Sequence, residues 1–327
     1  MTLHLGFAPD ATRARAIDRR MYLELAASLR HVTDACGERL PFDRSATARL
    51  IDSLEAGARC SPQAFACYYE LVSALIDGND EEALKSFSEL STQQAMAAAR
   101  VMEPLRPFEA CARSARYHRM MVGEEAIMLG MLPPPAPIAD AFAERFERGM
   151  AMMHRAVPEL AGEVDAIVHE VVPIASDPDR DGQIDGGSHF QLWGALFLNA
   201  DFHKTDVAML EVIAHESAHS LLFGLCTEEM LVSNDDSELY SSPLRADLRP
   251  MDGIYHATFV SARMHWAMSR LLESGAAQGV CNDEIAAACV ADRRNFEAGD
   301  SVVRQHGQLT RLGSELMDGA RRYMATA

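Results

Sequence analysis

The residues best suited to chemistry lie in the stretch "LEVIAHESAHSLLFGL", residues 210–225. His215 and His219 are four residues apart, so a helix would project both imidazoles from one face. Two imidazoles in this arrangement can bind one metal ion, and Glu216 can act on a metal-bound water as a base or an orienting group. The flanking residues are apolar, and buried histidines and glutamates need partners. The pattern therefore predicts a metal centre; the alternative is a pair of hydrogen-bonded core histidines.

The third protein ligand decides which chemistry such a centre performs. The continuation H-x-x-G-x-x-H is excluded because Leu222 stands at the glycine position. Glu238, Asp252 and His256 are the downstream candidates, and spacing alone does not choose among them.

The segment that follows the motif, "YSSPLRADLRPMDGIYHATF", resembles one family. This family is the H-E-x-x-H-containing, 2-oxoglutarate-dependent peptide β-hydroxylases. There the motif helix is followed by a tyrosine, a segment like P-W-R-x-D-P-R-P and a helix that opens with a pattern like G-x-x-H-G-x-Y. The resemblance covers about residues 190–320, including the closing "LTRLGSELM", and departs from the pattern at Leu244, Leu248 and Ala257, which affects the shape of the pocket. The matching residues are Tyr240, Pro243, Arg245, Asp247, Arg249, Pro250, Gly253 and His256.

The resemblance implies an iron oxygenase acting on a peptide or a carrier-bound amino acid. Its metal would be Fe(II), which suits imidazole ligands with open positions. Its cosubstrate would be 2-oxoglutarate, whose distal carboxylate is best held by a guanidinium. The implied ligands are His215, His219 and His256, the implied carboxylate clamp is Arg245 or Arg249, and the implied catalytic residues are Glu216 and Tyr240.

Two other functions remain open at this point. The first is a zinc metallopeptidase that uses His215, His219 and either Glu238 or Asp252, with Glu216 as the general base. The second is a non-catalytic peptide-binding protein. A peptidase has no need of a carboxylate clamp beside its metal, and a binding protein would tolerate the loss of either motif histidine.

The hydrophobic pattern predicts a mainly α fold with a small β component. Residues 10–122 have helical periodicity, including "DEEALKSFSELSTQQAMAAARVM", and "GMLPPPAPIAD" interrupts it. We therefore expect a helical region over residues 1–130 and a catalytic region over residues 131–327. In the latter, "VDAIVHEVVPIAS" and "HFQLWGALFLNA" are predicted strands. The motif helix is predicted at about 206–223 and the next ligand helix at about 251–273, both near the small sheet, with further helices to the end.

The composition excludes several classes of partner. The formal net charge is −18, which disfavours nucleic acid and anionic membranes because both require basic patches. No apolar run approaches the roughly 20 residues that span a bilayer, and the first residues lack the layout of a leader peptide. The seven cysteines are scattered without a C-x-x-C pair, as in a reducing compartment. We therefore expect a cytoplasmic protein; the sequence does not indicate its oligomeric state.

Overall fold

The computed structural model describes residues 6–37, 39–96, 99–121, 130–180, 183–245, 247–275 and 282–327. It is mainly helical with a small sheet component, as the sequence predicts. Two compact units are each assembled from separate stretches of chain. The first unit contains residues 1–14, 140–166 and 201–327, and the second contains residues 15–139 and 167–200. The boundary expected between residues 130 and 131 lies inside the second unit.

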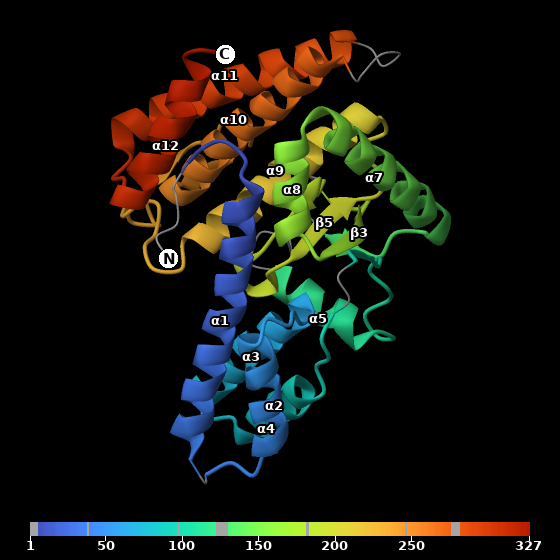
Figure 1. Cartoon of the computed structure of the whole chain (residues 1–327), viewed down its shortest axis with the longest axis vertical. Coiled ribbons are helices and arrows are strands. Elements are labelled where there is room, and N and C mark those ends of the chain that lie inside the picture. Colours follow the sequence, from blue (N-terminus) through green and yellow to red (C-terminus); the bar gives the residue numbers. More distant parts are fainter. Residues whose placement is uncertain are drawn as a thin grey trace. The chain divides into compact units, whose positions relative to one another are not determined.

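Helices form the first part of the second unit (Figure 1). Their ends follow from local sequence: the Asp43 side chain accepts a hydrogen bond from the Ala46 N–H, Asn79 does the same for Glu82, and Pro62 stands in a first turn, where it sacrifices no helical hydrogen bond. The helices are α1 (Ala11–Cys36, which begins in the first unit), α2 (Arg44–Glu55), α3 (Pro62–Ile76), α4 (Asp80–Ser91) and α5 (Ala112–Met121).

The helix expected over residues 80–102 is wrong for the described residues beyond Ser91, and its residues 97–98 lie outside the described residues. The Thr92 hydroxyl donates to the carbonyl of Glu89, and the backbone N–H of Met96 donates to the carbonyl of Arg59. Val101–Met102 then forms β1, which pairs with a later strand. Local polar competition and a distant strand therefore override the helical periodicity.

A small mixed sheet in the second unit has the strand order β1-β3-β5-β4, with β2 paired antiparallel to β3. Its two longest strands, β3 (Glu170–Ser176) and β5 (Ala195–Asn199), run parallel and confirm the two predicted strand regions. Both predicted strands begin too early. The first overlaps α8 (Pro158–Ile167), and the start of the second, Phe190–Leu192, forms a 3-10 helix. The remaining strands are β2 (Met131–Leu132) and β4 (Gly186–Gly187).

The first unit contains most of α7 (Ala136–Ala156), followed by α8 and the helices that carry the motif. These are α9 (Asp206–Leu225) and α10 (Met251–Ser274), which pack against each other and are joined through the hairpin of β6 (Leu239–Ser241) and β7 (Leu248–Pro250). α11 (Asn282–His306) and α12 (Arg311–Met324) pack on α10, as Figure 1 shows. Within the described parts of the chain, no helix has both the length and the apolar character needed to cross a membrane.

A buried charge network joins the separate stretches of the first unit. The carboxylate of Glu163 on α8 is fully buried and pairs with Arg13 at 3.0 Å and with Arg263 of α10. Arg263 also donates to the carbonyl of Phe7 at 2.7 Å, and the Phe7 ring stacks on Tyr323 of α12. The segment around Phe7 is therefore an integral part of this unit.

Candidate functional site

The motif helix α9 begins and ends with defined hydrogen bonds. The Thr205 hydroxyl accepts from the N–H of Ala208 at 3.0 Å, and the N–H of Cys226 closes the last turn on the carbonyls of Leu222 and Phe223. Most of its residues are buried, which explains its nearly continuous apolar sequence. The predicted motif helix is confirmed, and His215 and His219 occupy successive turns of it.

The next helix, α10, brings the third histidine to this pair. It starts directly after Pro250 and ends at Gly275, whose φ of 63° requires the left-handed conformation that glycine adopts readily. His256, in the second turn, is 7% exposed. The helix predicted over residues 251–273 is thus also confirmed, and its packing on α9 places His256 against His219.

The three imidazoles contact one another in a row. The Nε2 atoms of His215 and His219 are 3.2 Å apart, and the Nδ1 atoms of His219 and His256 are 2.9 Å apart. The rings of His219 and His256 are stacked, with centroids 5.2 Å apart and planes 15° apart. His219 is therefore the central member, with a different ring nitrogen facing each neighbour.

This arrangement fits two metal ligands better than three. Nitrogens bound at about 2.0–2.1 Å to one tetrahedral ion lie roughly 3.4 Å apart, close to the separation of the His215 and His219 Nε2 atoms. His256 faces the other ring nitrogen of His219, Nδ1, through its own Nδ1. No group of three or more histidine, cysteine, aspartate or glutamate side chains within the described ranges has the geometry to hold a metal ion. A three-histidine centre therefore requires a rotation of the His219 or His256 ring.

The environment of the histidines favours their neutral forms. Burial, together with the neighbouring His215 and His256, holds the pKa of His219 well below its usual value. Burial also lowers the pKa of His256, against the opposing charge of Asp252. Neutral imidazoles are the form that binds metals, and close contact between two imidazolium ions would be strongly unfavourable. The donor set is thus chemically suited to a transition metal.

The acidic candidates lie at different distances from the cluster. Asp252 is one turn before His256, and its Oδ2 lies 3.9 Å from His256 Nε2. Glu238 accepts a hydrogen bond of 2.6 Å from the Tyr240 hydroxyl on the β6–β7 side of the unit. Glu216 is 5% exposed, and its Oε1 lies 4.0 Å from His215 Nε2. Of the three proposed third ligands, His256 is the one in direct contact with a motif histidine.

The two predicted clamp arginines share one acidic partner. Arg245 Nε lies 3.2 Å and Arg249 Nη1 3.3 Å from the carboxylate of Asp247. Arg249, whose side chain is 20% exposed, lies beside the first turn of α10, because a methyl group at Gly253 would be 3.5 Å from its Cβ. Arg249 is thus positioned next to the helix that carries His256.

Tyr240 takes a different position from the one expected of a catalytic residue. Its hydroxyl contacts Glu238 and Asn234, and its ring lies 5.1 Å from that of His306. These partners are outside the histidine cluster. In the described structure Tyr240 acts as a contact between the hairpin and the end of α11.

Two side chains that were not predicted from the sequence also border the histidine cluster. The sulfur of Met264 is 3.1 Å from His215 Nδ1, and the Phe223 ring lies 5.4 Å from that of His256. Met264 follows His256 by eight residues and Phe223 follows His219 by four, so helical spacing placed both on the faces that bear the histidines. This helical spacing is the sequence feature from which both contacts could have been predicted.

Comparisons with known proteins add no relative: no protein-family model matches the chain, and no curated protein matches it.

Proposed function

We propose that the chain is an Fe(II)- and 2-oxoglutarate-dependent oxygenase that hydroxylates a peptide or a carrier-bound amino acid. The observation that carries the proposal is the contact of His256 with His219 across α9 and α10. It supplies a third imidazole beside the motif pair, whereas Glu238 is engaged by Tyr240. An all-imidazole donor set is one that iron accepts, as zinc does.

Each of the candidate residues would have a separate role. His215 and His219 would hold the metal, with His256 as the third ligand after a ring rotation. When bound, Fe(II) with 2-oxoglutarate and O₂ supplies the oxidising power for C–H hydroxylation. Buried Glu216, close to His215, would orient a ligand or a water molecule. Arg249, beside the first turn of α10, would bind the distal carboxylate of the cosubstrate.

A zinc metallopeptidase is the second candidate, and the position of Asp252 favours it. Asp252 lies beside His256 and would complete a site with His215 and His219, with Glu216 as the general base. The two candidates differ in metal, in the third ligand and in the role of Glu216.

The first experiment is metal analysis of protein purified without oxygen and reloaded with Fe(II) or Zn(II). We expect His215→Ala and His219→Ala to abolish binding and His256→Ala to weaken it by more than about 100-fold, beyond the usual effect of a residue that only supports a ligand. His265→Ala is the matched control, because His265 is similarly buried on α10 but contacts Tyr323. Full metal binding by His256→Ala would remove the three-histidine proposal.

The second experiment measures succinate release and peptide cleavage in Glu216→Gln. Loss of a general base would lower a peptidase rate by about 10²–10⁴. In the proposed oxygenase, succinate formation from 2-oxoglutarate should persist at a reduced rate. Cleavage of a peptide by the wild-type protein, lost in this variant while the metal is retained, would establish the peptidase instead.

A further inference from the structure

A cavity of about 230 Å³ lies in the second unit, away in sequence from the histidine cluster. It is bordered by α2, by residues 58–60 and by residues 91–95. Its described lining includes Arg49 and Arg59 and no aspartate or glutamate, although the chain has 48 acidic residues and 30 lysines and arginines. A cationic cavity in a strongly acidic chain indicates an anionic ligand.

Both guanidinium groups have unused donors. Arg59 Nε donates to Asp18 Oδ2 at 2.7 Å, whereas its two terminal nitrogens have no hydrogen-bond partner among the described residues. Arg49 is exposed, and its side chain likewise has no polar partner in the part of the chain that the structure describes. A guanidinium presents five N–H donors, so the pair has ample capacity for a carboxylate.

Buried contacts of Asp18, the partner of Arg59, and a hydrogen bond to the Arg59 backbone hold this arginine in place. Asp18 is 2% exposed, and its Oδ1 accepts a hydrogen bond from Trp193 Nε1 at 3.0 Å and lies 2.7 Å from His169 Nε2. The carbonyl of Arg59 is held by the N–H of Met96 at 2.8 Å. A donor held in this way loses little conformational entropy when a ligand binds.

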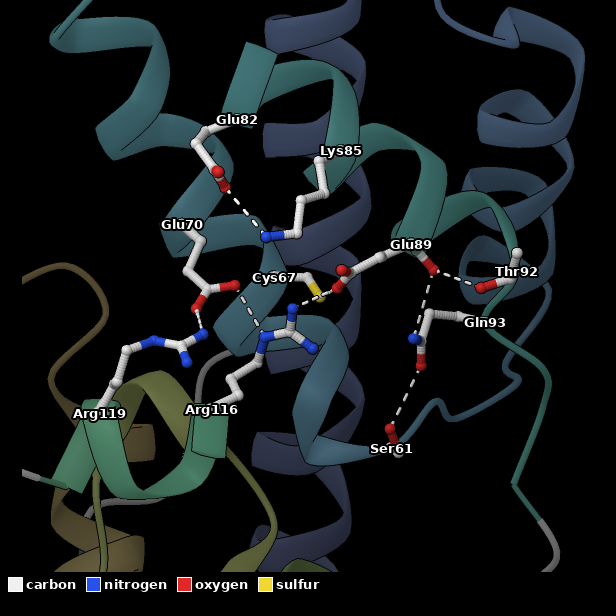
Figure 2. Close-up of polar contacts among 10 residues, drawn as sticks. All are labelled: Ser61, Cys67, Glu70, Glu82, Lys85, Glu89, Thr92, Gln93, Arg116 and Arg119. Atoms are coloured by element: carbon white, nitrogen blue, oxygen red, sulfur yellow. Dashed lines mark hydrogen bonds and ion pairs between the residues drawn. The ribbon is translucent and has the colours of Figure 1, made fainter. Parts of the chain in front are cut away.

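The part of the lining around Gln93 is held by hydrogen bonds as well (Figure 2). Gln93 donates to the carbonyl of Glu89 at 3.4 Å and accepts from the Ser61 hydroxyl at 3.2 Å. The neighbouring carboxylate of Glu89 is bound by Arg116, so its charge is compensated by a group outside the cavity lining. The polar wall is therefore ordered without repelling an anion.

One feature of the cavity would otherwise oppose an anion. The C-terminal end of α2 borders it, and the last carbonyls of a helix carry partial negative charge. Arg19 donates to the carbonyls of Leu54 and Glu55, so two of these carbonyls are already bound by a cation. This contact offsets the unfavourable end of the helix dipole.

We propose that this cavity binds an organic carboxylate that carries a short apolar group. Arg49 and Arg59 hold the carboxylate, and the apolar group lies against Leu50 and Leu54 of α2. The volume is below the ~300–1,000 Å³ of sites for drug-sized ligands, so the ligand is the size of one amino-acid residue. It is either a free small acid or the C-terminal residue of a peptide.

The experiment is isothermal titration of the full chain with N-acetyl-leucine and with its uncharged amide, at up to about 10 mM, where weak small ligands are detected. We expect the acid to bind at least about 10-fold more tightly than the amide, the usual effect of a charge-assisted hydrogen bond. A second pair of probes, a leucine-terminated peptide and its C-terminal amide, identifies the source. Preference for either acid form over its amide supports the site.

Amino-acid substitutions test whether the acid binds in this cavity. Arg49→Gln should weaken binding of the acid by about 10-fold, because one paired charge is lost. Ser53→Glu should do the same by placing a carboxylate in the lining. Arg294→Gln is the matched control, since Arg294 is an exposed arginine of α11 in the first unit. Equal binding of acid and amide, unchanged binding by Arg49→Gln, or no binding of any probe would each overturn the proposal.

Discussion

At the scale of single residues, Asp247 is the acidic partner of both arginines of the proposed clamp. Its carboxylate is 54% exposed and lies within 3.3 Å of both Arg245 and Arg249. Exposed pairs of this kind contribute only about 0–1 kcal/mol. A bound cosubstrate that is shielded from water could therefore take over an arginine from Asp247.

Two substitutions should change the 2-oxoglutarate requirement in opposite directions. Arg249→Gln should raise the half-saturating concentration by about 10²–10³, the cost of leaving a shielded carboxylate unpaired. Asp247→Asn should lower it by up to about fivefold, because a competing partner is removed. Succinate release measures both, with iron content as the control. A rise in both variants would show that Asp247 positions the arginines instead of competing for them.

Asp292 of α11 is a second residue with a measurable consequence. It is 1% exposed, and its Oδ2 has no hydrogen-bond partner among the residues described. Burial, reinforced by the nearby charge of Glu211, raises its pKa from 3.8 to about 8. The folded state therefore keeps a proton that the unfolded state has released, so stability decreases as the pH rises from about 4 to about 8.

Asp292→Asn should remove this pH dependence. At pH 9 the variant should be more stable than the wild-type protein by up to ~5 kcal/mol, since a tenfold difference in proton affinity corresponds to about 1.36 kcal/mol. Near pH 4 the two proteins should be similar. Urea denaturation across this range measures the difference, and Glu297→Gln, at an exposed position of α11, is the control. A constant difference at every pH would show that packing, not ionisation, distinguishes the variant.

At the scale of elements, the contact of α10 with α11 depends on a missing side chain. A methyl group at Gly299 of α11 would lie 2.2 Å from the Thr258 hydroxyl of α10, far inside van der Waals contact. Thr258 is fully buried, and its hydroxyl donates to the carbonyl of Ile254, so it has little freedom to move. Because α10 also carries His256, this contact helps to position the site.

Gly299→Ala should therefore destabilise the protein by about 1–3 kcal/mol, the usual cost of overpacking. This loss would occur although alanine is intrinsically the better helix former. Thr258→Ala removes the clashing oxygen, and the double variant should be more stable than the sum of the single effects predicts. Gly253→Ala, where the added methyl meets only ordinary contacts, is the control. Thermal unfolding gives all four values, and additive effects would exclude the clash.

The elements that sequence predicted well are those specified by local signals. α9 and α10 have a capping threonine, a terminal glycine and long helical patterns, and both matched within about two residues. The error after Ser91 came from a distant partner, because Val101 pairs with Glu170 of β3. His219 and His256 face each other through their Nδ1 atoms. This contact depends on how each ring is rotated and on how α9 packs on α10, and residue spacing specifies neither. The pairing of Arg245 and Arg249 with Asp247 likewise depends on the backbone path of the β6–β7 hairpin.

At the scale of the whole molecule, one carboxylate connects all three stretches of the first unit. Glu163 from residues 140–166 contacts Arg13 from residues 1–14 and Arg263 from residues 201–327. All three side chains are buried, with Arg13 the most exposed at 4%. Removing one partner of such a network leaves uncompensated buried charge, which is costly.

Glu163→Gln should lower the free energy of unfolding by about 3–5 kcal/mol. The same substitution at Glu55, which forms an exposed pair with Arg30, should cost less than about 1 kcal/mol. Guanidinium denaturation of the two variants compares them directly. Similar losses in both would mean that the buried network contributes no more than a surface ion pair.

The docking of Phe7 into the first unit has a consequence for synthesis on the ribosome. Its carbonyl is bound by Arg263, which is 256 residues later in the chain. At about 5–20 residues per second, translation takes on the order of 10–50 s to reach that arginine. During this interval Phe7 has emerged without Arg263, so the first unit cannot close as it emerges. Its assembly must wait for the nascent chain to be nearly finished.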